Sequence, residues 1–165
     1  MSQSTFIPPE IWYAQLPTVY AAAGALITDP AGRVLMVKPN YRDYWMIPGG
    51  TLEADEPPHA GCAREVTEEI GLIRPVGRLL VMDWTPRAGQ RPRPVVYFLF
   101  DGGVLDDSAP IRLPADEIDD YAFVDPAEAP GRLAPNVAHR LPAALSARVN
   151  GSTIYLPGAG SINNV

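Results

Sequence analysis

Cysteine, histidine and clusters of basic residues are scarce in this sequence. Its 165 residues include one cysteine, Cys62, and two histidines, His59 and His139. A single cysteine forms no internal disulfide and supplies no cysteine-based zinc site, which is compatible with a reducing compartment. Thirteen Lys and Arg against nineteen Asp and Glu give a net charge of −6, without a basic block. General binding to nucleic acid is therefore not expected.

Long, uninterrupted hydrophobic runs are also missing. The uncharged stretch 11–28 is broken by Gln15, Pro17 and Thr18, and no Lys or Arg precedes it. It therefore resembles neither a membrane span nor a secretory signal, and we expect a cytoplasmic protein without membrane association. Proline and glycine, in contrast, are abundant, with 19 and 14 residues. This composition predicts short elements and many turns.

The length fits one compact domain. We expect an extended lead-in over residues 1–18, a single domain over 19–157 and a loosely held tail over 158–165. Apolar runs bounded by turn residues predict strands at 19–28, 33–38, 79–84, 95–100 and 121–124. Helical signals cover 57–70 and 136–149. These elements interleave without a regular βαβ alternation, which predicts an α/β fold of the α+β kind, a mixed β-sheet between helices.

The predicted helix at 57–70 gathers carboxylates on one face. Glu65, Glu68 and Glu69 fall within roughly a 100° sector, and apolar residues occupy the opposite side. Like charges at this spacing repel one another, and Arg64 can offset only part of that repulsion. A hard divalent cation such as Mg²⁺ or Mn²⁺ would compensate the rest, because these ions prefer carboxylate oxygen. A solvated acidic helix face would also account for the pattern.

The spacing of these residues carries further information. The pattern Gly50-x5-Glu56-x7-Arg64-Glu65-Val66-x-Glu68-Glu69-x-Gly71-Leu72 matches every fixed position of the Nudix box. Seven such identities arise by chance with a probability of roughly 10⁻⁸ per starting position. The preceding run Trp45 to Gly50 is similar to the entry to that box in Nudix hydrolases. The chain thus resembles the Nudix hydrolase family over about residues 19–124.

This resemblance implies a Nudix-like mixed sheet and a pyrophosphatase that hydrolyses a diphosphate bond in a nucleoside diphosphate-linked compound, with water attacking phosphorus. It implies metal binding by Glu65, Glu68 and Glu69, with a carbonyl of Gly49 or Gly50 as a further ligand for Mg²⁺ or Mn²⁺. Glu56 and Arg64 resemble the supporting ion pairs of the family. The general base would come from the helix, such as Glu68 or Glu69, or from a downstream loop containing Asp116, Glu117, Asp119 and Asp120. Among those downstream residues Glu117 is favoured, although a solvated acidic turn is an alternative there.

The substrate contacts are less defined. Lys38 and Arg42 lie between the first hairpin and the Gly-Gly turn, where they would meet a phosphate or form plain surface charge. Tyr97 would stack on a base or belong to the core. We expect a small phosphoanhydride as substrate, and a homodimer is an open interpretation of the apolar lead-in. Two alternatives are a non-catalytic Nudix-type module that binds a nucleotide or metabolite, and a related isomerase of isoprenoid diphosphates, for which Cys62 is badly placed.

Overall fold

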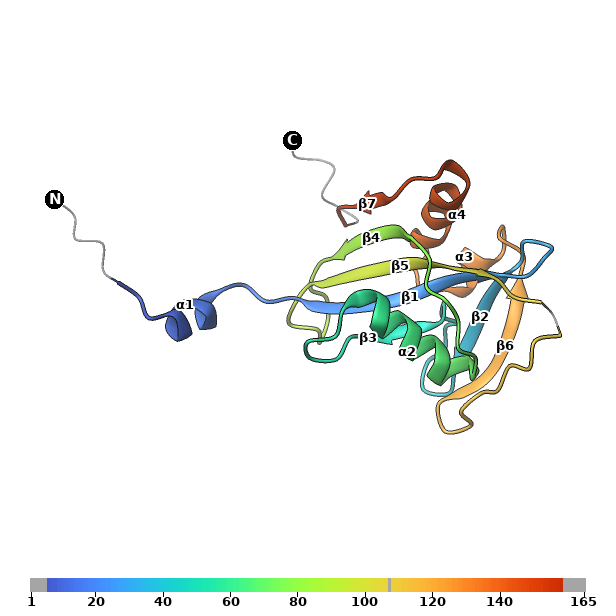
Figure 1. Ribbon diagram of the computed structural model, residues 1–165, viewed down its shortest axis with the longest axis horizontal. Helices are drawn as coiled ribbons and strands as arrows, with labels where there is room; N and C mark the ends of the chain where they lie inside the picture. Colours follow the sequence, from blue (N-terminus) through green and yellow to red (C-terminus); the bar gives the residue numbers. More distant parts are fainter. Residues whose placement is uncertain (1–5, 107, 159–165) are drawn as a thin grey trace.

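A mixed seven-stranded sheet organises the chain (Figure 1). The computed structural model describes residues 6–106 and 108–158. The strands are β1 (Tyr20–Thr28), β2 (Val34–Pro39), β3 (Gly49–Thr51), β4 (Leu79–Thr85), β5 (Val95–Val104), β6 (Ile118–Val124) and β7 (Ile154–Leu156). Their order is β6-β2-β1-β5-β4-β7, and β3 pairs with β1. The β1–β5 and β4–β7 pairs are parallel and the other pairs are antiparallel.

Helices α2 (Pro58–Ile70) and α4 (Arg140–Asn150) cover opposite faces of this sheet, and the described residues also form α1 (Pro9–Gln15) and α3 (Ala129–Arg132). Successive residues of a strand point to opposite faces. In β1, Ala25 and Ile27 pack in the cluster that contains Val66 of α2, and Leu26 packs in the cluster that contains Leu141 of α4. This arrangement confirms the predicted mixed sheet between helices.

Local sequence explains where the main elements begin and end. Helix α2 starts directly after Pro57 with Pro58 in its first turn, where a missing N–H costs nothing. It ends at Gly71, whose φ of 70° is left-handed. The turn at 29–32 closes through a 3.0 Å hydrogen bond from the Gly32 N–H to the Asp29 carbonyl. The principal strands and α2 therefore lie close to their predicted positions.

Two predictions of local structure were wrong. Residues 9–15 form helix α1 instead of an extended segment, because Pro9 at its first position and Glu10 in its first turn both favour a helix start. The last helix starts at Arg140, not near 136, and residues 135–139 form turns. Pro142 explains the difference, since it fits the first turn of a helix from Arg140 but would break a helix from 136.

Short elements escaped prediction. Strands β3 and β7 have three residues each and α3 has four, too few to show a hydrophobic period. The predicted tail at 158–165 lies outside the described residues except for Gly158, which is buried.

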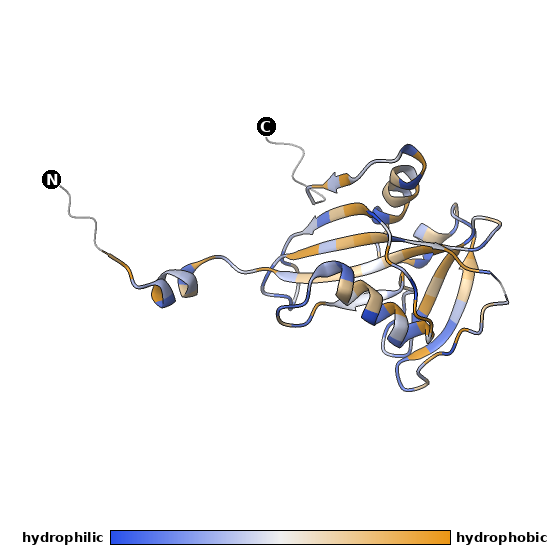
Figure 2. Ribbon diagram, in the orientation of Figure 1, coloured by the Kyte–Doolittle hydropathy of each residue, from blue (hydrophilic) through white to orange (hydrophobic). Residues whose placement is uncertain are grey.

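Helix α1 projects away from the sheet (Figure 1) and buries none of its residues. Its Trp12 and Tyr13 are exposed, and Figure 2 shows hydrophobic positions along this outlying helix as well as along the strands of the sheet. Within the described part of the chain, none of the helices combines the length and the apolar character needed to span a membrane.

Candidate active site

The short strand β3 brings the Gly-Gly turn against the centre of the sheet. Gly49 pairs with Gly24 of β1, and Gly50 pairs with Ala23. A Cβ atom at Gly49 would lie 2.3 Å from the Ala23 carbonyl oxygen, and its φ of 145° is one that side chains rarely allow. Only glycine therefore fits this position, which fixes the backbone next to helix α2.

Glu69 is the most enclosed carboxylate of helix α2. It is 4% exposed, and its Oε2 accepts a 2.8 Å hydrogen bond from the Gly49 N–H. Burial raises the pKa of Glu69 to about 8, and the charges of Glu65, Glu117 and Glu68 add to that rise against the effect of the Gly49 N–H. A buried carboxylate with this raised pKa is poised to take up a proton or a cation.

Glu65 lies beside the same strand, one helical turn earlier. Its carboxylate fills the space next to Gly50, where a Cβ atom would come within 2.4 Å of Oε2. Burial raises the pKa of Glu65, while the neighbouring Arg64 lowers it. Gly50 thus allows the Glu65 carboxylate to approach β3 closely, and Glu69 reaches the same strand through the Gly49 N–H.

Arg64 connects the helix to the preceding loop. Its Nε and Nη2 donate to the two oxygens of Glu56 at 2.9 and 3.0 Å, and Nη2 also donates to the Thr51 carbonyl at 3.1 Å. Its Nη1 donates to Glu65 at 3.0 Å and to Glu68 at 2.9 Å. Hydrogen bonds from Arg64 and from the Glu53 N–H lower the pKa of Glu56 to about 2. Glu56 and Arg64 therefore form the ion pair that the sequence indicated.

Glu117 approaches this cluster from the turn before β6. Its carbonyl accepts a 3.0 Å hydrogen bond from the Asn40 N–H, and its charge is close enough to raise the pKa of Glu65 and Glu69. Among the acidic residues of the run 116–120, Glu117 is the one whose charge is a leading cause of both raised pKa values. Within that run, Glu117 is the one that the fold directs toward the helix.

The residues around β3 suit a hard divalent cation by their chemistry. Glu65 and Glu69 provide desolvated oxygens of like charge, and the glycine carbonyls lie beside them without side chains in the way. Glu68 is more open, with a side chain 56% exposed. Among residues 6–106 and 108–158, however, no three Asp, Glu, His or Cys side chains already converge as an ion site. Arg64 holds Glu65 and Glu68, so these two side chains must turn to bind a cation.

The raised pKa of Glu69 predicts an unusual pH dependence of stability. The folded protein keeps the Glu69 proton up to about pH 8, whereas the unfolded chain releases it near the ordinary glutamate pKa of 4.5. Between these values the folded state binds more protons, so stability in EDTA should fall as pH rises, by about 2 kcal/mol from about pH 5 to about pH 7.5. Urea unfolding at several pH values measures this change. Glu69→Gln should remove most of the fall, and an identical fall in that variant would contradict the assignment.

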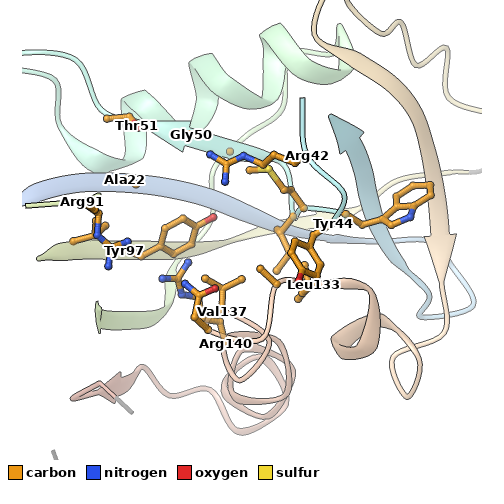
Figure 3. A pocket seen from close by; sticks show the side chains of 17 residues that line it. Ala22, Arg42, Tyr44, Gly50, Thr51, Arg91, Tyr97, Leu133, Val137 and Arg140 are labelled. Atoms are coloured by element: carbon orange, nitrogen blue, oxygen red, sulfur yellow. The ribbon is translucent and has the colours of Figure 1, made fainter. Parts of the chain in front are cut away.

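A cleft of about 280 Å³ opens beside Gly49, Gly50 and Thr51 (Figure 3). Its other walls come from β1, β5, the segment 42–47 and the segment 133–140. Arginines 42, 91 and 140 line it, and none of its lining residues is acidic. Although the protein has a net charge of −6, this cleft is cationic. It meets the carboxylates of α2 at the Gly-Gly strand.

Two of the three predicted substrate contacts reach this cleft. Arg42 and Tyr97 both line it, and Figure 3 shows their side chains directed into the same space. Burial raises the pKa of the Tyr97 hydroxyl, which packs over Gly24. Lys38 lies elsewhere, because its ammonium group donates to the carbonyls of Pro39 and Arg42 and it is not among the lining residues.

The sequence did not reveal the buried ion pair at the base of the cleft. Arg140 of α4 is 8% exposed, and its Nε donates to Oδ2 of Asp83, which is fully buried in β4, at 2.7 Å. The available signal was an acidic residue in the middle of an apolar strand, since a buried carboxylate needs a partner. His139 also meets this pair, since it is partly buried with Nε2 3.2 Å from Oδ1 of Asp83.

Cys62 is unsuited to act as a nucleophile. It is buried in helix α2 and packs in the core cluster with Val66 and Ile70. Burial raises the pKa of its thiol to about 12, so the reactive thiolate is not populated near neutral pH. Cys62 therefore has a packing role, and the isomerase alternative lacks the reactive thiol that it needs.

The fold and the site define a class of protein. It is an α+β domain in which a glycine strand, β3, lies next to an acidic helix, α2, and also lines a cationic cleft. A family model for the NUDIX domain matches residues 19–144. The chain therefore belongs to the NUDIX family.

Curated relatives and solved structures agree with this family. Diphosphoinositol polyphosphate phosphohydrolase 2 of Rattus norvegicus is 35% identical over 88 residues, 53% of this chain and 48% of that protein. This chain thus spans about half the length of that relative. The MutT protein from Methanosarcina mazei Go1 has a TM-score of 0.65 and 25% identity over 82% of this chain and 96% of that one. A UDP-X diphosphatase shares the fold at a TM-score of 0.68 and 22% identity over 86% of this chain and 68% of that one.

Proposed function

We propose that this protein is a divalent-metal-dependent hydrolase that cleaves a diphosphate bond in a nucleoside diphosphate-linked compound by attack of water on phosphorus. The observation that carries this proposal is the buried Glu69 carboxylate, which faces Gly49 at the edge of a cationic cleft. The names of its relatives, a phosphohydrolase and a diphosphatase, support diphosphate hydrolysis in general.

Glu65, Glu68 and Glu69, with a carbonyl of Gly49 or Gly50, would hold Mg²⁺ or Mn²⁺. Such an ion neutralises phosphate charge and lowers the pKa of a bound water. Glu56 holds the guanidinium group of Arg64 at two points and so keeps the loop 51–56 against α2. Arg64 in turn donates hydrogen bonds to Glu65 and Glu68 and so restrains both carboxylates. The hydrogen bonds of Arg64 to Glu56, Glu65 and Glu68 support these proposed roles.

The general base must accept a proton at neutral pH from a water near phosphorus. Glu69 has the raised pKa that suits a base, Glu68 is open to solvent, and the charge of Glu117 acts on Glu69 from the turn before β6. We propose Glu68, Glu69 and Glu117 as candidates for this role. Arg42, which Figure 3 shows beside Gly50 in the cleft, would hold the diphosphate.

A panel of nucleoside triphosphates, dinucleotides and sugar nucleotides tests the proposal. Each compound is incubated in ¹⁸O-labelled water with Mg²⁺, Mn²⁺ or EDTA, and mass spectrometry shows which product phosphorus gains the label. We expect cleavage within the diphosphate of at least one compound and none in EDTA. Tight nucleotide binding without turnover across the panel would instead support a non-catalytic binding module. A cytoplasmic location and a homodimer stay predictions from the sequence.

A further inference from the structure

The guanidinium group of Arg140 is held in one orientation at the base of the cleft. Its Nε donates to Oδ2 of Asp83 at 2.7 Å and its Nη2 donates to the Thr85 hydroxyl at 2.8 Å. Its Cζ atom lies 4.1 Å from the centre of the Tyr97 ring, so the group also stacks on that ring. These two hydrogen bonds and the stacking on Tyr97 restrict rotation of the guanidinium group. Figure 3 shows it beneath Tyr97 at the cleft wall.

One nitrogen of this group is still available. In the described residues, Nη1 of Arg140 has no hydrogen-bond partner, whereas Nε and Nη2 each have one. Because Arg140 lines the cleft, its remaining donor can serve a bound ligand. Guanidinium nitrogens only donate hydrogen bonds, so the complementary atom on that ligand is an oxygen or an unprotonated ring nitrogen.

The charge around Arg140 favours a neutral acceptor over an anion. The buried carboxylate of Asp83 balances the positive charge of Arg140, so the pair attracts an anion weakly. In contrast, Arg42 and Arg91 have no acidic partner within residues 6–106 and 108–158. The diphosphate is therefore better placed near Arg42 and Gly50, which leaves Arg140 for the group attached to it.

The walls near Arg140 suit a planar ring. Tyr44, Leu133 and Val137 provide aromatic and aliphatic surface in this cleft, and Figure 3 shows Val137 beside Arg140. None of the residues that line the cleft is a carboxylate that could accept from an amino group. An exocyclic amino group placed against Nη1 would put two donors face to face.

We propose that Arg140 is a specificity-determining residue that donates from Nη1 to the exocyclic oxygen at C4 of a pyrimidine or C6 of a purine, so that the protein prefers nucleotides with an oxo group at that position over those with an amino group there. This inference rests on the proposed function, since it assumes that the cleft receives a nucleoside diphosphate group. Uracil and hypoxanthine present such an oxygen, whereas cytosine and adenine present an amino group at the same ring position.

Binding of nucleoside diphosphates in EDTA tests this inference without turnover. Isothermal titration gives the Kd of UDP against CDP and of IDP against ADP for the wild-type protein. We expect UDP and IDP to bind roughly tenfold more tightly than CDP and ADP, because an unmatched buried donor is costly. Arg140→Lys keeps a cation beside Asp83 and should reduce both ratios to about twofold. Arg93→Met is the matched control, because Arg93 stacks on Tyr20 and does not line the cleft.

The ratio within each nucleotide pair separates recognition from a structural role. A change that merely loosens the α4–β4 contact would weaken both members of a pair equally and leave the ratio intact. Equal affinities within both pairs for the wild type, ratios that persist in Arg140→Lys, or no measurable binding of any of the four nucleotides would each overturn the inference. Hydrolysis is measured separately on the substrate panel. Turnover without base preference would refute only this inference, and selective binding without turnover would refute only the hydrolase.

Discussion

Glu69→Gln is expected to lower kcat by roughly a hundredfold or more at saturating Mg²⁺. The amide keeps the size of the side chain and can still accept the hydrogen bond from the Gly49 N–H, so the fold should survive. It cannot carry the negative charge or accept a proton from water. Steady-state kinetics on the best compound of the panel, with a thermal melt of the same sample, measure both effects.

Glu128→Gln is the matched control for this experiment. Glu128 precedes α3 and lies 4.0 Å from Arg132, away from the residues that line the cleft. Its substitution should leave kcat unchanged within about twofold. A Glu69→Gln protein with wild-type kcat would show that the buried carboxylate is not part of the reaction.

Gly49→Ala should destabilise the protein by about 3 kcal/mol. The new Cβ atom would lie 2.3 Å from the Ala23 carbonyl oxygen and 2.4 Å from the Gly24 Cα atom, both on the backbone of β1. Because the pairing of β1 with β3 would have to open to relieve that clash, the support of Glu69 should be lost with it. Urea unfolding measures the stability, and activity at low temperature measures the site.

Gly32→Ala is the control that measures the cost of a positive φ without a steric clash. Gly32 also has a positive φ, of 83°, but a Cβ atom there meets nothing within 4 Å. We expect a loss of only about 1 kcal/mol at this position, with unchanged activity. If Gly49→Ala and Gly32→Ala lowered the free energy of unfolding equally, the close approach of β3 to β1 would not contribute to stability.

The sequence predicted the elements whose patterns are long or strongly marked. Helix α2 is bracketed by Pro57 and Gly71, and β1 is a long apolar run, so both were placed nearly at their final bounds. Strand β3 has three residues, two of them glycine, and no alternation to detect. Its existence depends on pairing with β1, which is a tertiary effect. The position of Pro142 could have corrected the start of the last helix.

The candidate site was predicted unevenly for a similar reason. Glu56, Arg64, Glu65 and Glu69 lie within one short segment, so their spacing alone indicated that they act together. Arg140 and Asp83 are 57 residues apart and meet only through the packing of α4 on β4. For Lys38, the phosphate contact was predicted from its nearness to the glycine turn in the sequence. Its ammonium group instead donates to backbone carbonyls and does not line the cleft. Long-range contacts of this kind leave little trace in a single sequence.

The most direct test is a Mn²⁺ titration followed by electron paramagnetic resonance, because free and bound Mn²⁺ give different signals. If the acidic face of α2 is a cation site, the wild-type protein should bind Mn²⁺ in competition with Mg²⁺, and Glu65→Gln should weaken that binding roughly tenfold while Glu128→Gln leaves it unchanged. A wild-type protein that leaves all added Mn²⁺ free, or a Glu65→Gln protein that binds it equally well, would contradict the account.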